Sequence, residues 1–147
     1  MKVFFDTNVL IDVLANRRPF VSDSAALWTL SESRRITGLV SVLTFTNTFY
    51  IVRRLTDLKT ARRALTLIRD TFEPVACDGE LINAAIGSKF ADFEDAVQYL
   101  SAVRVGADCV VSRNVNHFPR TTTCPVLTPA EFLVAQVLRG EDKPADQ

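Results

Sequence analysis

The sequence predicts an α/β fold, a three-layer sandwich in which helices cover both faces of a central parallel sheet. Short apolar segments typical of buried strands alternate along the chain with longer segments that have helical apolar spacing. The chain has 147 residues, 48% of them hydrophobic and 23% charged, which is ordinary for a globular protein with one substantial core. We therefore expect one domain over residues 1–139 and a disordered tail at 140–147.

The N-terminal segment joins a strand to a helix. Residues 3–5 are apolar and suit a buried strand, and Asp6 follows where that strand must end. Thr7 and Asn8 are residue types that begin helices, and the apolar pattern then continues to residue 14. Because open α/β sheets bind ligands at the carboxyl ends of their strands, Asp6 is either a helix cap or an acid of a binding site.

The rest of the chain continues this alternation. Helices are expected from about residue 22 to Arg35, from Thr44 to Leu55, from Asp57 or Thr60 to Thr71, after a turn at Asp78 and Gly79 to about Ser88, at 92–105 and from Thr128 onward. Strands are expected at 39–42, 72–77, 108–112 and 125–127, with a loop or single turn at 114–119. Pro74 places the segment at 72–77 near an edge of the sheet. Gly106 ends the helix expected at 92–105.

Charge is unevenly distributed along the chain, although the net charge is zero. Residues 13–69 contain ten basic and three acidic side chains, whereas residues 70–100 contain seven acids and one lysine. A basic surface beside an acidic pocket would suit a protein that binds polyanions through metal ions. Paired arginines on helices are also typical of a solvated face, so the pattern is compatible with both interpretations.

The cysteines and the terminal segment indicate a cytoplasmic protein. Cys77, Cys109 and Cys124 are widely spaced and form no CxxC pattern, so we expect reduced thiols and no zinc site. No apolar run approaches the roughly 20 residues that a membrane-spanning helix needs. Lys2 and Asp6 exclude a secretion signal at the N-terminus.

Three acids lie within four residues at the expected start of the helix at 92–105. Asp92 and Asp95 share one face of that helix, and Glu94 points about 100° away from Asp95. Like charges this close are unfavourable unless a cation compensates them, and Mg²⁺ or Mn²⁺ prefers oxygen ligands such as these. The other interpretation is a solvated helix start that the helix dipole stabilises.

A second polar segment follows the strand expected at 108–112. Ser112, Arg113 and Asn114 come directly after apolar residues, and His117, the only histidine, follows in the loop. Because the carboxyl ends of parallel strands meet at one edge, this segment is expected to converge with Asp6 and the acids at 92–95. An ordinary turn would also explain Asn114.

Four motifs occur in a fixed order: D-T-N-V-L-I-D from residue 6, S-x-L-T-x-T-N from residue 41, D-F-E-D-A from residue 92 and V-V-S-R-N-x-x-x-F from residue 110. Together they resemble the PIN domain family, and within it the VapC-like toxins that have Asn in the second motif. The resemblance spans roughly residues 1–135. It implies a PIN-like sandwich and a Mg²⁺- or Mn²⁺-dependent endoribonuclease. Such proteins are commonly homodimers and commonly the toxin of a toxin–antitoxin pair.

The resemblance also implies roles for individual residues. Asp6 and Asp95 match acids of the family and would hold the metal ion, and Asp92 and Asn114 would complete the catalytic set. Four neighbouring side chains would orient the ion, its water or the phosphate: Thr7, Asn47, Glu94 and Ser112. Four further residues are candidates for phosphate or RNA-backbone contacts: His117, Arg113, Arg17 and Arg18.

Two departures from the family pattern leave an alternative open. Asn47 stands where many PIN nucleases have Glu, and His117 stands where related sequences have an acid. A degenerate PIN scaffold that binds RNA or a protein without cutting is therefore the main alternative. A generic phosphatase-like enzyme lacks support, because no nucleophile elbow, P-loop or D-x-D motif follows the first strand. The helices at 44–55 and 60–71 are candidates for antitoxin or dimer contacts, although core packing also explains their apolar residues.

Overall fold

The computed structural model describes residues 1–120 and 123–141, and within them five strands form one parallel sheet. The strands are β1 (Lys2–Phe5), β2 (Thr37–Ser41), β3 (Glu73–Val75), β4 (Cys109–Val111) and β5 (Val126–Leu127). Their order across the sheet is β3-β2-β1-β4-β5, and each neighbouring pair is parallel. The order of the strands reverses at β1. In open α/β sheets, ligands bind at the carboxyl ends of the strands where the order reverses.

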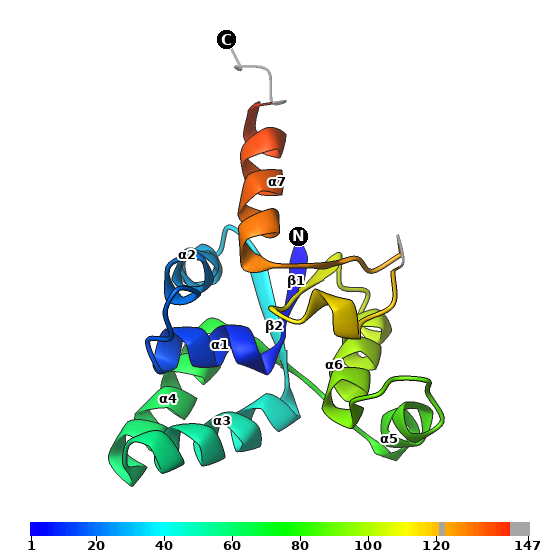
Figure 1. Cartoon of the computed structure of the whole chain (residues 1–147), viewed down its shortest axis with the longest axis horizontal. Coiled ribbons are helices and arrows are strands. Elements are labelled where there is room, and N and C mark those ends of the chain that lie inside the picture. Colours follow the sequence, from blue (N-terminus) through cyan, green and yellow to red (C-terminus); the bar gives the residue numbers. More distant parts are fainter. Residues whose placement is uncertain (121–122, 142–147) are drawn as a thin grey trace.

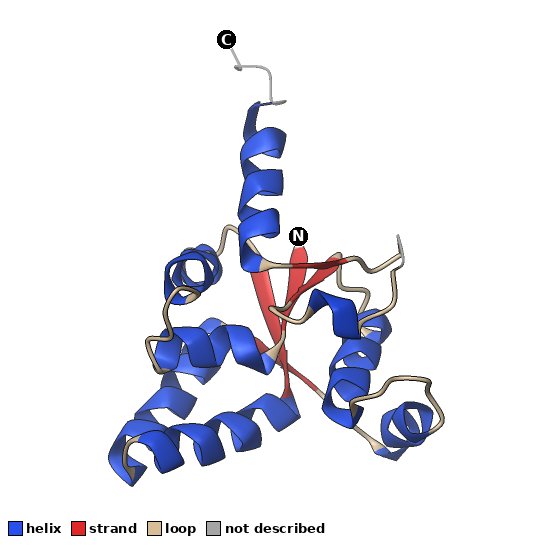
Figure 2. Ribbon diagram, viewed as in Figure 1, coloured by secondary structure: helices blue, strands red, loops and turns tan. Residues whose placement is uncertain are grey.

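Helices cover both faces of the sheet, which confirms the predicted sandwich (Figures 1 and 2). They are α1 (Thr7–Leu14), α2 (Val21–Glu32), α3 (Val42–Leu55), α4 (Leu58–Thr71), α5 (Gly79–Ile86), α6 (Phe93–Arg104) and α7 (Pro129–Glu141), with a 3₁₀ turn, η1, at Val115–His117. Helices α1, α2, α4 and α7 contribute to the core on one face, and α6 packs on the other. Helix α5 lies against α6, and α3 lies against α4.

The central strand β1 contributes to the core on both faces. Val3 and Phe5 point to the face of α1 and α2, and Phe4 points to the face of α6, because successive side chains of a strand alternate. All three are fully buried, as expected of a parallel sheet covered on both sides. Gly38 in β2 allows a close approach, since a Cβ atom there would lie 2.6 Å from the Phe72 ring.

Ser41 sets the boundary between β2 and α3. The sequence predicted a strand through Val42 and a helix from Thr44. Instead, the Ser41 hydroxyl accepts a hydrogen bond from Leu43 N at 3.1 Å and caps the helix, so α3 begins at Val42. The predicted elements are present, with a boundary shifted by two residues because the cap lies earlier than expected.

Two other boundaries bear on the predictions. Helix α2 ends at Glu32, three residues before the predicted end at Arg35, and Arg34 has a left-handed φ of 57°. The strand predicted at 72–77 is the shorter β3, which lies at an edge of the sheet as Pro74 predicted.

The remaining predictions concern the C-terminus, the membrane and the thiols. Helix α7 continues to residue 141, and residues 142–147 of the predicted tail lie outside the described residues. None of the described helices is both long and apolar enough to cross a membrane. All three cysteines are free; Cys109 and Cys124 are buried and Cys77 is partly buried.

Candidate active site

Asp6 lies at the carboxyl end of β1, directly before α1. Its backbone is extended, with φ −64° and ψ 143°, but its carboxylate makes no capping hydrogen bond. Instead, the Ser112 hydroxyl donates to Asp6 Oδ2 at 2.6 Å, and Gln98 Nε2 donates to Oδ1 at 3.0 Å. Asn8 Nδ2 also donates to Oδ2, at 3.2 Å. The carboxylate is therefore held at the sheet edge by side chains from three segments, and helix capping does not explain its position.

The first turn of α6 brings its three acids to the same edge. Asp92 is the N-cap of α6, and its Oδ1 accepts a hydrogen bond from Asp95 N at 2.9 Å. Asp95 is buried, with 8% of its surface exposed, whereas Glu94 and Asp92 are exposed. A pocket of about 230 Å³ gathers most of the predicted site residues, namely Asp6, Thr7, Asp92, Glu94, Asp95, Asn114 and His117. The predicted convergence is present in the structure; the roles of the residues remain predictions.

The acids of this pocket destabilise one another's ionised forms. Burial, followed by the charges of Asp6 and Asp92, raises the pKa of Asp95 to about 6. Partial burial of its carboxyl group and the Asp6 charge likewise raise the pKa of Glu94, although much of the residue is exposed. Burial raises the pKa of Asp6 despite the hydrogen bonds that its carboxylate accepts. The negative charge of the pocket is therefore incompletely compensated by the protein, and a bound cation would supply the missing positive charge.

Gln98 on α6 connects the two acidic segments and was missed in the sequence. Its Nε2 donates to Asp6 Oδ1 at 3.0 Å and to Glu94 Oε1 at 3.1 Å, while its Oε1 accepts a hydrogen bond from Thr7 N at 3.2 Å. The side chain is 2% exposed. Because Gln98 follows Glu94 by four residues and Asp95 by three, helical spacing alone places it on the acidic face.

Thr7 and Asn47 lie on the side of the pocket formed by α1 and α3. The hydroxyls of Thr7 and Thr44 are 3.0 Å apart, and Thr44 is buried. A hydrogen bond from the Asn47 side chain to Glu94 opposes the rise in the pKa of that carboxyl. Asn47 thus contacts the acidic cluster through Glu94.

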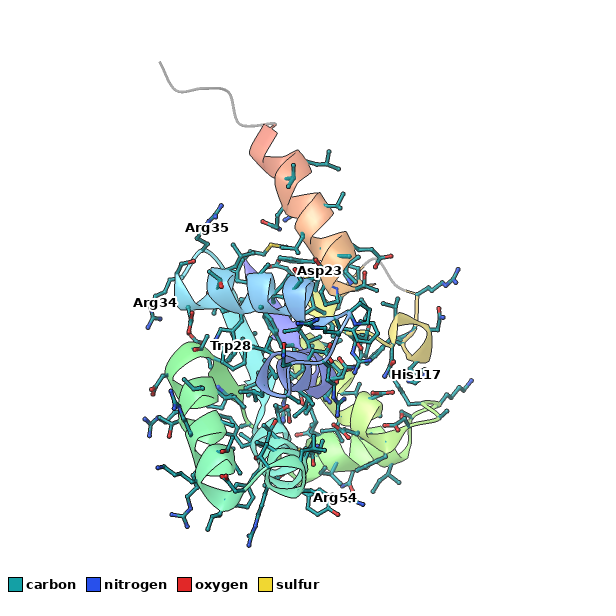
Figure 3. All side chains as sticks on the ribbon, turned by 60° about the vertical axis from the view of Figure 1, so that its left-hand side comes forward. Asp23, Trp28, Arg34, Arg35, Arg54 and His117 are labelled. Carbon is teal, nitrogen blue, oxygen red and sulfur yellow. The ribbon has the colours of Figure 1, made fainter. Side chains whose placement is uncertain are left out.

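His117 on η1 contacts the buried acid of the pocket. Its Nδ1 lies 3.1 Å from Asp95 Oδ2, and 56% of the histidine side chain is exposed. This contact opposes the rise in the pKa of Asp95. Figure 3 shows His117 on the side of the molecule opposite Arg34 and Arg35. The basic residues of the N-terminal half therefore do not gather into one patch at the site.

Arg113 pairs with an acid that lies outside the pocket. Its Nε lies 2.8 Å from Asp12 Oδ2, and its guanidinium carbon lies 4.3 Å from the centre of the Phe20 ring. Arg113 does not line the pocket of Asp6 and Asp95, whereas the exposed Arg17 does. Arg18 is exposed and is not part of that pocket's lining.

The donor set fits a hard divalent cation that keeps much of its water. Within residues 1–120 and 123–141, no three His, Cys, Asp or Glu side chains are grouped closely enough to enclose an ion. Mg²⁺ is usually held by one or two carboxylates and retains several waters, so Asp6 and Asp95 suffice as its charged ligands. Asp6 accepts three hydrogen bonds, which leaves at least one lone pair of its two oxygens available.

Comparison with known proteins places this arrangement in a family context. The model of the PIN domain family matches residues 2–116. Among similar solved structures, VapBC2 from Rickettsia felis bound to a promoter DNA fragment has 14% identity and a TM-score of 0.65, with 87% of this chain and 98% of that chain covered. A toxin–antitoxin complex from Klebsiella pneumoniae has 19% identity and a TM-score of 0.64, covering 86% and 97%. VapC20 from Mycobacterium tuberculosis, a sarcin–ricin loop cleaving toxin, has 16% identity and a TM-score of 0.59, covering 74% and 86%.

No curated protein matches the chain in a sequence search. At these identities, the structural likeness establishes the fold.

Proposed function

The chain belongs to the PIN domain family, and we propose that it is a Mg²⁺- or Mn²⁺-dependent endoribonuclease acting as the toxin of a toxin–antitoxin pair. The observation that carries this proposal is the pocket in which Asp6, Glu94 and Asp95 have raised pKa values. The similar proteins support it, since VapC20 is a sarcin–ricin loop cleaving toxin and the Klebsiella pneumoniae structure is a toxin–antitoxin complex.

In the proposed mechanism a cation would supply the chemistry, and the protein would hold that cation in place. A cation held by Asp6 and Asp95 would acidify the attacking water and neutralise charge on the scissile phosphate. Ser112 and Gln98 fix the two oxygens of Asp6, and the Asp92 cap fixes the first turn of α6, which carries Asp95. Glu94 faces the same pocket and would accept hydrogen bonds from water.

The other proposed site residues surround this centre. Asn114 lines the pocket and, with Thr7, would donate hydrogen bonds to phosphate or water. Asn47 would hold Glu94 in place. His117 contacts Asp95 through Nδ1 at 3.1 Å, and its second ring nitrogen, Nε2, would meet a phosphate. The phosphate role predicted for Arg113 would compete with its ion pair to Asp12.

The proposed partners are an antitoxin protein and a second copy of the chain. Helices α3 and α4 expose large apolar side chains beside arginines: Tyr50 is 64% exposed, Leu55 58% and Leu67 40%. Exposed apolar surface of this kind is typical of protein interfaces. We assign these helices to antitoxin or dimer contacts, and we propose a cytoplasmic location.

Cleavage of RNA by the purified protein tests the proposed function. With Mn²⁺, the wild-type protein is expected to cut single-stranded or structured RNA, and Asp95→Asn is expected to lower the rate by at least a hundredfold. Asp78→Asn is the matched control, because Asp78 also caps a helix but lies at the start of α5. Equal cleavage by wild type and Asp95→Asn would contradict the proposal.

The non-cleaving scaffold remains the second candidate because of two observations. His117 occupies one side of Asp95, and the second motif contributes the neutral Asn47 instead of an acid. Titration calorimetry with Mn²⁺ separates the two functions. Binding that is lost in Asp95→Asn supports the nuclease, and no binding at millimolar Mn²⁺ supports the scaffold.

A further inference from the structure

The ion pair between Asp12 and Arg113 joins the two segments that carry the candidate active site. Asp12 lies on α1, which begins directly after Asp6, and Arg113 stands between Ser112 and Asn114. Asp12 is fully buried, and the Arg113 side chain is 23% exposed. The contact of 2.8 Å is an ion pair rather than a well-aligned hydrogen bond, and Ser24 Oγ approaches the same Asp12 oxygen at 3.4 Å.

This pair is the outermost of several contacts between the segment from Asp6 to Asp12 and the residues that follow β4. The innermost is the 2.6 Å hydrogen bond from Ser112 to Asp6. In the middle, Arg113 N donates to Asn8 Oδ1 at 3.4 Å. The Asp12 ion pair and the Phe20 ring then hold the guanidinium at the far end. Arg113 thereby attaches the segment from Ser112 to Asn114 to α1 through both its backbone N–H and its side chain.

The surroundings of Arg113 do not suit a residue that follows RNA phosphates. Its charge is matched by a buried carboxylate at 2.8 Å, which reduces the positive potential that it presents to a polyanion. Its guanidinium carbon lies 4.3 Å from the centre of the Phe20 ring, a cation–π contact that also holds the group away from solvent phosphate. Breaking these contacts would leave the buried Asp12 carboxylate without its ion-pair partner, with only the longer-range charge of Arg17 to compensate it, which is unfavourable.

We propose that Arg113 is a positioning residue, which through Asp12 holds Ser112 and Asn114 against Asp6. This inference rests on the proposed nuclease function, because it assigns to Arg113 a part in the same site. It replaces the phosphate contact that the sequence suggested for this residue. Misplacement of active-site groups by about 1 Å can lower a rate by a hundredfold. The Asp12–Arg113 ion pair can therefore control the cleavage rate by positioning Ser112 and Asn114.

Three variants and a binding measurement test this role. Arg113→Lys keeps the positive charge but loses the planar group, and Asp12→Asn removes a charge that cannot touch RNA because Asp12 has no exposed surface. Both are expected to lower kcat by about tenfold or more and to leave KM nearly unchanged. Arg120→Met removes an exposed arginine beside Asn114 and is the control for loss of one positive charge near the site.

RNA affinity is then measured against salt concentration in proteins that also carry Asp95→Asn, so that the RNA stays intact. Loss of one phosphate contact lowers the slope of log affinity against log salt by about 0.7–0.9. Arg113→Met is expected to leave this slope unchanged. A lower slope for Arg113→Met, or wild-type kcat for Arg113→Lys, would overturn the inference.

The outcome for Asp12→Asn depends on its folding, which thermal denaturation reports. If it folds, unchanged kcat would overturn the inference; if it does not, Arg113→Lys decides, since that variant keeps both charges. Cleavage by the wild-type protein separates this inference from the proposed function. If the wild type cuts RNA and the Arg113 and Asp12 variants cut equally well, only the positioning role fails. If the wild type does not cut RNA, both proposals fail.

Discussion

Two neighbouring helices, α5 and α6, begin in the same way and differ in what surrounds the first turn. Asp78 caps α5 by accepting a hydrogen bond from Leu81 N at 2.9 Å, and Asp92 caps α6 by accepting one from Asp95 N at the same distance. Arg104 donates to Asp78 at 2.7 Å. The hydrogen bond from Arg104, followed by the one from Leu81 N, lowers the pKa of Asp78 to about 2.

The start of α6 has the opposite electrostatics. Burial and neighbouring carboxylates raise the pKa of Asp95 to about 6, and the His117 contact offsets only part of the rise. A helix N-terminus favours negative charge in both places, so the helix dipole does not explain the difference. What differs is the neighbouring charge: Arg104 pairs with Asp78, whereas the carboxylates of Asp6 and Asp92 surround Asp95. A compensated acid of this kind stabilises the fold, and an uncompensated cluster is available to a ligand.

The largest expected difference between the two helix starts is their response to metal ions. Saturating Mn²⁺ at about 100 times its Kd would stabilise the wild-type protein by about 2.7 kcal/mol, or roughly 5–10 °C in the thermal midpoint. Asp95→Asn is expected to lose most of this shift, and Asp78→Asn to keep it. Thermal denaturation with and without Mn²⁺ measures both. An undiminished shift in Asp95→Asn would remove Asp95 from the metal site.

Asp95 and Asp78 should also change the stability of the protein with pH in opposite directions. The folded pKa of Asp95, about 6, lies above its ordinary value of 3.8, so the folded protein holds the proton more tightly. The metal-free protein is therefore expected to lose stability as pH rises from about 4 to 6, on the order of 1 kcal/mol after solvent screening. Asp95→Asn should remove this loss, as thermal midpoints in a chelator would reveal. An identical pH profile for wild type and variant would contradict the raised pKa.

Asp78 contributes to stability with the opposite pH dependence, and its effect is the smallest of the three. Its folded pKa of about 2 lies below the ordinary 3.8, so its stabilisation is present above about pH 4 and is lost as pH falls toward 2. Arg104→Gln is expected to lower the thermal midpoint slightly at low salt and to have no effect at 1 M salt, because the pair is exposed. RNA cleavage should be unchanged. Loss of cleavage would show that the α5–α6 contact also shapes the site.

The comparison also shows what the sequence can predict. The strand before Asp6 and the acids of D-F-E-D-A belong to local patterns, and parallel topology brings such strand ends and helix starts to one edge. Local patterns therefore predicted the sheet and the convergence of Asp6, Asp95 and Asn114 in one pocket. The start of α3 differs by two residues from the predicted one because Ser41 caps the helix earlier than Thr44 would.

The features that the sequence did not reveal depend on contacts between residues that are far apart in the chain. Gln98 was identifiable from its spacing after Glu94, but its hydrogen bond to Asp6 spans 92 residues of sequence. The partner of Arg113 could not be read from charge, because Asp12 lies 101 positions earlier and pairs with it only in the folded protein. The predicted basic surface is also a tertiary property, and Arg34 and Arg35 lie across the molecule from His117 (Figure 3).

The amide of Gln98 has a consequence for the pocket before any ligand arrives. One NH₂ group donates to Asp6 on one segment and Glu94 on another, and the amide oxygen is occupied by Thr7 N. Neither a glutamate nor a shorter asparagine has this combination of reach and donors. The spacing of the two acids is therefore fixed in the free protein. An arriving ion would meet Asp6 already oriented and Glu94 already placed beside it to accept hydrogen bonds from water, so little ordering would remain to oppose binding.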